Sequence, residues 1–442
     1  MTCPSQPSLP PAPLKRPPAS LPVWLAEHRL WGELSRVAVR LGVRLLVVGG
    51  GVRDWLLGRT PGDWDLVVSH SPQRFVAALR DALPVTATVL LDEAMQVWRL
   101  QLADGTVLDV AAMQEGNLIA DLSRRDLTLN AIAWELPDGI WHDPLSGIAD
   151  LQAGLLRVPA RQNLEDDPLR VLRVYRFAAT LGYTISEPFA AWAGELAPLL
   201  RHPAGERMGA EWAKILASGR AACTLQLMQA HGTLGEALGC PQADWQAGIL
   251  TIAAGEKSWN QRPGDAWART RTWLEGPVRE DRPRLQAVML AALLAPLAEA
   301  PRAGVMTRLR LSRKEVQLVR CLCEEAEGFA RALRERFGKR AQHRLFKRCG
   351  ENFPGLAWLQ AATATPPDRE LIGACLADYW QRVDHPLPRH VNGHDLLGLP
   401  GLGPGPAIAD WLTAVEEETA VGALHSREEA LAWVAARLGD AV

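Results

Sequence analysis

The 442-residue chain lacks the features that mark a membrane-spanning or secreted protein. No apolar run approaches the roughly 20 residues that a helix needs to cross a bilayer. The N-terminal segment 1–22 is rich in proline and carries Lys15 and Arg16, but it has no apolar core of the kind found in a secretory signal. We therefore expect 1–22 to be a disordered arm of a cytoplasmic protein.

Cysteine gives no sign of a disulfide framework or a metal cluster. The sequence holds seven cysteines, an odd number, scattered along the chain. Cys321 and Cys323 are closer together than the C-x-x-C spacing of a zinc site, and no histidine cluster accompanies them. We expect buried free thiols, as is usual in a reducing cytoplasm.

A strong charge of either sign is also absent. The net charge of −2 neither requires nor excludes a nucleic-acid partner, so RNA binding would need a local basic patch. One exists at 331–348, where Glu335 is the sole acid. An ordinary solvated helix face is the alternative interpretation. The basic residues that we consider for RNA contact are Arg331, Arg334, Lys339, Arg340, Arg344 and Lys347.

Hydrophobic periodicity divides the chain into a mixed first part and a helical remainder. Strand patterns lie at 45–48, 65–68, 97–102 and 106–110. Asp104-Gly105 marks a hairpin turn between the last two. Helical patterns lie at 73–83, 168–181, 207–216, 284–299 and 313–334. The predicted fold class is α+β, with a small mixed sheet followed by an all-α remainder.

The first strand pattern ends in Gly49-Gly50-Gly51, and Arg53 follows. Glycines let the backbone approach a ligand closely, and the amide groups after such a turn can point at phosphate oxygens. The Arg53 guanidinium can neutralise phosphate charge with two parallel hydrogen bonds. Gly49, Gly50 and Arg53 are therefore candidates for triphosphate binding, although many glycine turns are purely structural.

Two carboxylates, Asp63 and Asp65, open the next strand. Residues two apart in a strand face the same side, so these side chains lie together. A divalent cation relieves their repulsion, and hard oxygen ligands favour Mg²⁺, which can activate a hydroxyl and stabilise a leaving pyrophosphate. Asp63 and Asp65 are the predicted catalytic and metal-binding residues, and Asp109 on the fourth strand is a candidate third ligand. An isolated D-x-D is usually a surface pattern, and the nearby glycine turn is what favours the metal site.

Taken together, Val48 to Gly58 and Asp63 to Val68 resemble the signature of class II tRNA nucleotidyltransferases and bacterial poly(A) polymerases, of the polymerase-β-like superfamily. The resemblance covers most of the chain. It implies a Mg²⁺-dependent enzyme that extends tRNA 3′ ends, with segment 331–348 binding the tRNA; no protein partner is predicted. Two other classes stay open: a nucleotidyltransferase acting on protein or a small molecule, and an RNA-binding protein with an inactive catalytic domain.

The segment from Ser123 to Ala131 resembles the ribose-recognising motif of that family. The resemblance implies that Arg125 contacts the triphosphate, Asp126 the ribose hydroxyls, and Asn130 the sugar or nearby backbone. As a plain sequence pattern, the Arg-Arg-Asp would equally suit a helix-cap cluster.

Asp167 and Arg170 are three residues apart on a predicted helix, so they reach one face. The carboxylate only accepts hydrogen bonds and the guanidinium only donates, which matches cytosine and adenine and mismatches uracil and guanine. A surface salt bridge is the alternative. The pair resembles the family's base-reading motif Glu-Asp-x-x-Arg, with Asp166 in place of the glutamate. Arg173 and Arg176 continue along the same side and are assigned to this nucleobase site.

Only Val110 to Arg124 separates Asp109 from Arg125. Relatives carry a longer flexible segment here, which is linked to switching the pocket from CTP to ATP. The chain is therefore most similar to CC-adding tRNA nucleotidyltransferases, which add cytidines from CTP without a template and release pyrophosphate. Complete CCA addition, A addition and poly(A) synthesis remain open.

The resemblance also implies a domain order. A catalytic head at 23–145 follows the arm, and then come helical domains. They are a neck that reads the base at 146–225, a body at 226–330 and a tRNA-binding tail at 331–442.

Overall fold

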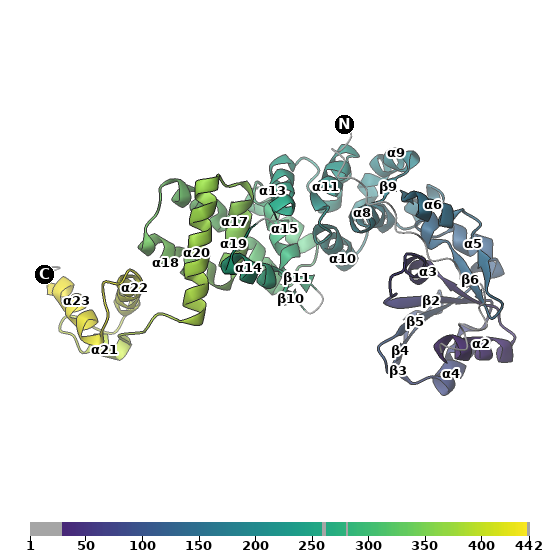
Figure 1. The fold of residues 1–442 in the computed structure, drawn as a ribbon, viewed down its shortest axis with the longest axis horizontal. Coiled ribbons are helices and arrows are strands. Elements are labelled where there is room, and N and C mark those ends of the chain that lie inside the picture. The colour runs from purple at the N-terminus through teal and green to yellow at the C-terminus, as the bar shows by residue number, and fades with distance from the viewer. Residues whose placement is uncertain (1–28, 259–261, 280–281, 440–442) are drawn as a thin grey trace. The chain divides into compact units, whose positions relative to one another are not determined.

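The computed structural model describes residues 29–258, 262–279 and 282–439, so the arm expected at 1–22 lies outside the described residues. The chain forms two compact units, Met1–Pro241 and Gln242–Val442. Figure 1 shows that the sheet belongs to the N-terminal unit, whereas the second unit is built of helices. Among the described residues, no helix is long and apolar enough to span a membrane.

A seven-stranded mixed sheet forms the head, in the order β3-β4-β5-β2-β1-β6-β7. The strands are β1 Leu45–Val48, β2 Asp63–Val68, β3 Val85–Asp92, β4 Val97–Leu102, β5 Val107–Ala112, β6 Ala133–Leu136 and β7 Ile140–His142. Within this sheet only the β2–β5 pair is parallel. The antiparallel β4–β5 pair confirms the hairpin expected at Asp104-Gly105.

Helices cover the sheet because its central strands are apolar on both faces. All four residues of β1 are buried. Leu46 and Val48 pack against α5 (Leu118–Ser123) in one apolar cluster. The helix α4 (Pro72–Ala82) packs on β4 and β5, and α2 (Arg29–Leu41) packs against α4 (Figure 1). The helix α3 (Gly49–Leu56) starts directly at the end of β1.

The sequence patterns missed three strands of this sheet, β3, β6 and β7. Most of β3 is exposed, so burial imposes no alternation on its residues. The β7 strand has three residues and depends on its pairing with β6. These strands are fixed by sheet pairing rather than by a local hydrophobic pattern.

Helices of the neck follow the head within the same unit. The helix α8 (Leu169–Leu181) begins after Pro168 and ends at Gly182, whose φ of 73° suits a glycine C-cap. It packs against α10 (Gly205–Leu216) and α11 (Ala221–Ala230). The remaining elements are α6 Gly147–Ala153, α7 Gln162–Asp166, α9 Glu187–Leu196, α12 Leu234–Leu238 and the short pair β8 Leu155–Leu156 and β9 Thr184–Ile185.

The second unit is helical apart from the two-stranded β10 Pro277–Arg279 and β11 Arg282–Pro283. Its helices are α13 Gln246–Ser258, α14 Asp265–Glu275, α15 Arg284–Leu294, α16 Glu299–Arg308, α17 Arg313–Arg334, α18 Lys339–Cys349, α19 Phe353–Thr363, α20 Pro366–Asp384, α21 Gly393–Leu397, α22 Pro406–Ala420 and α23 Arg427–Gly439. The helix expected at 284–299 is two helices, since Pro296 interrupts it. The helix expected at 313–334 is confirmed and starts with a Ser312/Glu315 capping box. The predicted α+β class is thus confirmed.

Gly147, at the start of α6, lies against the backbone beside the Asp126–Asn130 motif. A Cβ atom at this position would stand 2.2 Å from the carbonyl oxygen of Thr128. We predict that Gly147→Ala lowers the free energy of unfolding by roughly 1–3 kcal/mol, because backbone must shift to admit the methyl group. Denaturant unfolding measures this.

The matched control is Gly304→Ala on the exposed face of α16, where an added Cβ would meet no atom within 4 Å. That variant should gain about 0.5–1 kcal/mol, since alanine favours a helix interior over glycine. Equal stabilities of the Gly147→Ala variant and the unsubstituted protein would contradict the close packing at Thr128.

Candidate active site

Three carboxylates gather at one edge of the head sheet. Asp63 and Asp65 open β2, and the parallel register sets Asp65 beside Asp109 of β5. The Asp109 carboxylate is held by Arg99 of β4, which donates from Nε at 2.8 Å and from Nη2 at 2.7 Å. Asp63 and Asp65 therefore share one face as predicted, whereas Asp109 is paired with an arginine.

Asp65 carries the electrostatic signature of a crowded carboxylate. Burial raises its pKa, and the negative charges of Asp63 and Asp109 add to this, while the Arg125 charge and a backbone hydrogen bond from Gly50 oppose it. A cation bound here would relieve that repulsion. Among the described residues no group of three or more His, Cys, Asp or Glu side chains forms a ready metal site. The donor set that fits a divalent cation is the Asp63/Asp65 pair, and Asp109 as a third ligand stays a prediction.

Gly49 is required by the position of Asp65. Its φ is 78°, and a Cβ atom there would lie 2.4 Å from Asp65 Oδ2 and 3.0 Å from Arg125 Nη1. The glycines form the first turn of α3 rather than a loop, and the backbone N–H of Gly50 donates to the Asp65 carboxylate. A helix N-terminus favours negatively charged groups, which suits the expected role of Gly49 and Gly50 in binding triphosphate.

The two arginines expected at the triphosphate differ in their surroundings. Arg53 is buried and donates to both oxygens of Asp54, at 2.9 and 2.8 Å, and to Asn130 Oδ1 at 2.7 Å. Arg125 lies beside Gly49 and Asp65, and its buried Nε has no hydrogen-bond partner among the described residues. Arg125 thus offers donor capacity, whereas Arg53 anchors the site and its phosphate contact stays a prediction.

Asp126 and Asn130 are buried and bonded to each other, with Asn130 Nδ2 donating to Asp126 Oδ1 at 2.8 Å. Arg173 of the neck donates to Asp126 Oδ2 from Nε at 2.9 Å and from Nη2 at 2.6 Å. Burial opposes ionisation of Asp126, but the Arg173 charge and these hydrogen bonds hold its pKa below the usual range. The residues predicted to hold the ribose therefore lie together and join the head to the neck.

The same network continues into the neck through Glu211 of α10. Arg176 Nε donates to Glu211 Oε2 at 2.9 Å, and Arg173 Nη1 lies 3.6 Å from Glu211 Oε1. Arg53, Arg173 and Arg176 all stack near the Phe177 ring, the Arg176 guanidinium carbon being 3.4 Å from its centroid. Arg173 and Arg176 are thus engaged within the protein, and their contact with a base stays a prediction.

Asp167 and Arg170 flank the start of α8 but bond to other groups. Asp167 Oδ2 accepts from Arg207 Nη2 at 2.8 Å, and Oδ1 accepts from the backbone N–H of Leu169 at 3.2 Å. Arg170 Nη1 donates to the carbonyl oxygens of Arg124 at 2.7 Å and Asn163 at 3.0 Å. A carboxylate has about four acceptor sites and a guanidinium five donors, so both retain capacity for a base.

Asn163 is a site residue that the sequence patterns missed. It is buried, and its Nδ2 donates to the carbonyl oxygens of Ser123 and Arg125, each at 2.7 Å. With the Arg170 bond to the Arg124 carbonyl, the neck holds three consecutive carbonyls of the segment that carries Arg125. A lone asparagine before Asp166-Asp167 gives no signal for this role in the sequence.

The basic residues expected to bind tRNA divide into two groups. Arg340, Arg344 and Lys347 on α18 form ion pairs with three consecutive glutamates of α22. The second group comprises Arg331, Arg334 and Lys339. These three residues have no ion-pair partner within the described part of the chain. RNA binding by both groups stays a prediction.

Comparison with known proteins matches two family models to this chain. The Poly A polymerase head domain matches residues 45–157, and the probable RNA and SrmB-binding site of polymerase A matches residues 182–243. These matches cover the three-carboxylate edge and most of the neck.

Curated relatives match over most of their length. A CC-adding tRNA nucleotidyltransferase of Synechocystis is 31% identical over 402 residues, covering 88% of this chain and 92% of that protein. An A-adding tRNA nucleotidyltransferase of Deinococcus radiodurans is 29% identical, with 88% and 94% covered. Other relatives are named as CC-adding or CCA-adding enzymes.

Among solved structures, a Thermotoga maritima CCA-adding enzyme complexed with tRNA superimposes with a TM-score of 0.72 at 25% identity, covering 94% of this chain and 96% of that one. A relative above 30% identity, matched along nearly its whole length, shows the family of this chain. The chain belongs to the tRNA nucleotidyltransferase family, whose matched members are named CC-adding, A-adding and CCA-adding enzymes.

Proposed function

We propose that this enzyme adds two cytidines to the 3′ end of tRNA, using CTP and no nucleic-acid template, with release of pyrophosphate. The observation that carries this proposal is the short connection between β5 and the Arg125–Asp126 motif. After Ala112 the chain makes a single 3₁₀ turn at Gln114–Gly116 and the short helix α5, and Arg125 follows.

Hydrogen bonds hold the middle and the C-terminal end of this connection. In the middle, Asn117 caps α5 by accepting from the backbone N–H groups of Ile119 at 3.0 Å and Ala120 at 3.4 Å. At the C-terminal end, Asn163 and Arg170 bind the carbonyls of residues 123–125. A short, capped segment has little conformational freedom, so it is poorly suited to change the shape of the pocket from one nucleotide to another. This favours a single accepted base.

The choice of base rests on Asp167 and Arg170. Cytosine presents an amino donor to the carboxylate and a ring-nitrogen acceptor to the guanidinium, and uracil presents the reverse order. A mismatched base leaves two polar groups unpaired at about 1–3 kcal/mol each, which corresponds to roughly two orders of magnitude in discrimination. Adenine matches the same pair, so the fixed connection is what favours CTP over ATP.

Magnesium would be held by Asp63 and Asp65, where it would neutralise triphosphate charge and lower the pKa of the tRNA 3′-hydroxyl. Arg125 and the first turn of α3 would bind the triphosphate from the other side. Asp126 and Asn130 would position the ribose from the buried network. Free cysteines and a tRNA substrate suit a cytoplasmic enzyme.

Addition of the terminal A is the second candidate within the family, because a relative covering 88% of this chain is an A-adding enzyme. The two activities differ in the tRNA end that they extend. A CC-adding enzyme requires an end lacking CCA, and an A-adding enzyme requires an end that already carries CC.

The deciding experiment offers radiolabelled CTP and ATP separately and together to tRNA lacking its CCA end. We expect incorporation of two C residues from CTP and no labelled A, because the pocket should accept one base. A terminal A added after CC would contradict CC-only addition and show complete CCA synthesis. Labelling of tRNA ending in CC by ATP, with no incorporation of C into tRNA lacking its CCA end, would show an A-adding enzyme.

The metal assignment predicts a separate outcome. Asp63→Ala with Asp65→Ala should lower nucleotide transfer by at least three orders of magnitude, because both carboxylates for the cation are lost. The affinity for tRNA should remain within a few fold, since neither residue supports the core. Transfer is measured in single-turnover assays and binding by filter retention.

Asp104→Ala, in the β4–β5 turn of the same head, is the matched control for loss of an acidic residue. It should keep full activity. Full transfer by the double variant would refute the metal assignment, and equal loss in the control would trace the effect to the fold.

A further inference from the structure

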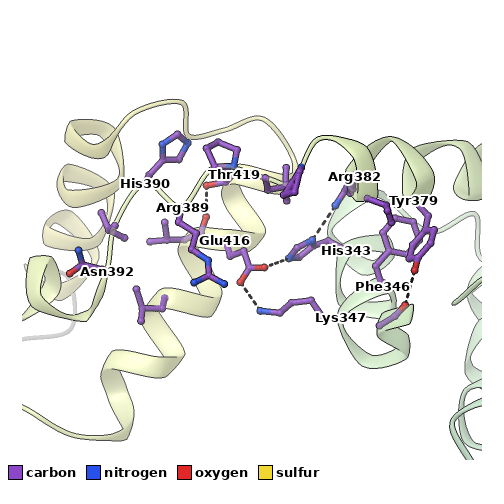
Figure 2. A pocket seen from close by; sticks show the side chains of 18 of the residues that line it. His343, Phe346, Lys347, Tyr379, Arg382, Arg389, His390, Asn392, Glu416 and Thr419 are labelled. Carbon is purple, nitrogen blue, oxygen red and sulfur yellow. Dashed lines mark hydrogen bonds and ion pairs between the residues drawn. The ribbon is translucent and has the colours of Figure 1, made fainter. Parts of the chain in front are cut away.

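The basic face of α18 is covered by acids from the same chain. Arg344 donates to Glu417 at 2.6 and 2.7 Å, Arg340 donates to Glu418 at 2.6 Å, and Lys347 donates to Glu416 at 2.6 Å. Figure 2 shows Lys347 and His343 facing Glu416 across the gap between the helices. The cations at 340, 344 and 347 share one helical face, and the acids follow in the reverse order.

These ion pairs are individually weak. Between 45% and 56% of each basic side chain is exposed to solvent. Each exposed ion pair contributes about 0.2–1 kcal/mol to the stability of the contact and is screened by salt. A partner with closely spaced negative charges can therefore compete for the same cations.

In the part of the chain that the structure describes, the apolar cluster that contains Val415 of α22 includes no residue of α18. A cavity of about 580 Å³ lies behind the ion pairs, between α18, α20 and α22 (Figure 2). Its walls include Phe346 and Tyr379 on one side and Leu412 and Val415 on the other. Separating the two sides therefore forfeits few apolar contacts.

The C-terminal helices have a hydrophobic core of their own. It contains residues from α21 to α23 and the segment before them, namely Val391, Leu396, Val415, Leu424, Ala430 and Val434. This module, residues 391–439, can keep its internal packing when the ion pairs to α18 break.

We propose that Glu416, Glu417 and Glu418 form an acidic latch that occupies the RNA-binding face of α18, and that the phosphodiester backbone of tRNA displaces it. The acids stand in for phosphates on Arg340, Arg344 and Lys347. Arg331, Arg334 and Lys339, which have no ion-pair partner in the described part of the chain, supply the first contacts. The inference rests on the proposed tRNA-binding role of this basic segment.

The test is the triple variant E416Q/E417Q/E418Q of the full chain, with tRNA affinity measured over a range of salt concentrations. Loss of the competing acids should tighten tRNA binding by about tenfold at low salt. The salt dependence should also steepen, because more phosphate counterions are released without acids to replace them.

The matched control, E370Q/D410N/E428Q, removes the same charge from exposed acids that make no ion pair within the described ranges. If both triple variants bind tRNA equally more tightly, the effect comes from net charge alone, and the latch proposal is overturned. Unchanged affinity in the first triple would overturn it as well.

A second variant keeps the proposal testable if the triple variant fails to fold. Lys347→Cys with Glu416→Cys lets a bifunctional thiol cross-linker with a reducible spacer hold the latch closed, so cross-linking should weaken tRNA binding and reduction of the spacer should restore it. Equal affinity in the cross-linked and reduced states would overturn the proposal. A wrong assignment of the added nucleotide leaves these results unchanged, because neither variant alters the head. A separate test checks the tRNA-binding face itself. If tRNA affinity is unchanged after Arg331, Arg334 and Lys339 are neutralised, the face is assigned wrongly.

Discussion

The Asp126 carboxylate is the group on which the rest of the site depends. It is buried at the junction of head and neck, and Asn130 from one side and Arg173 from the other satisfy its oxygens. The network extends through Asn130 to Arg53 and through Arg173 to Glu211. Removing one partner of a buried ion pair costs about 3–5 kcal/mol, because it leaves an uncompensated charge. The network therefore fixes the motif predicted to hold the ribose against the helix α8, where Asp167 and Arg170 are predicted to read the base.

A second connection fixes the same two parts through backbone atoms. Asn163 and Arg170 bind the carbonyls of residues 123–125, directly before Asp126. Arg125, beside Asp65 and Gly49, is thereby placed relative to Asp167 and Arg170. The distance between the carboxylate edge and the base-reading pair is thus set by hydrogen bonds between groups with few alternatives. Such preorganisation is what lets a protein surface take the place of a template.

The sequence predicted those features that local chemistry determines. Alternation of face along β2 placed Asp63 and Asp65 together, and Pro168 marked the start of α8. It could not predict partners that meet only in the folded chain. The Arg99–Asp109, Arg173–Asp126 and Arg344–Glu417 pairs join separate elements, and their charges look solvated in the sequence. Asn163 was invisible for the same reason, since its role is defined by carbonyls about 40 residues away.

The central claim is that Asp167 and Arg170 act as the template. The most direct measurement is the ratio of kcat/KM for CTP and UTP in the unsubstituted enzyme and in the D167A/R170A variant, with Glu187→Ala, an exposed acid in the first turn of α9, as control. The account predicts discrimination of roughly two orders of magnitude in the unsubstituted enzyme and in the control, and near-equal use of CTP and UTP in the double variant. Unchanged discrimination in the double variant would contradict it.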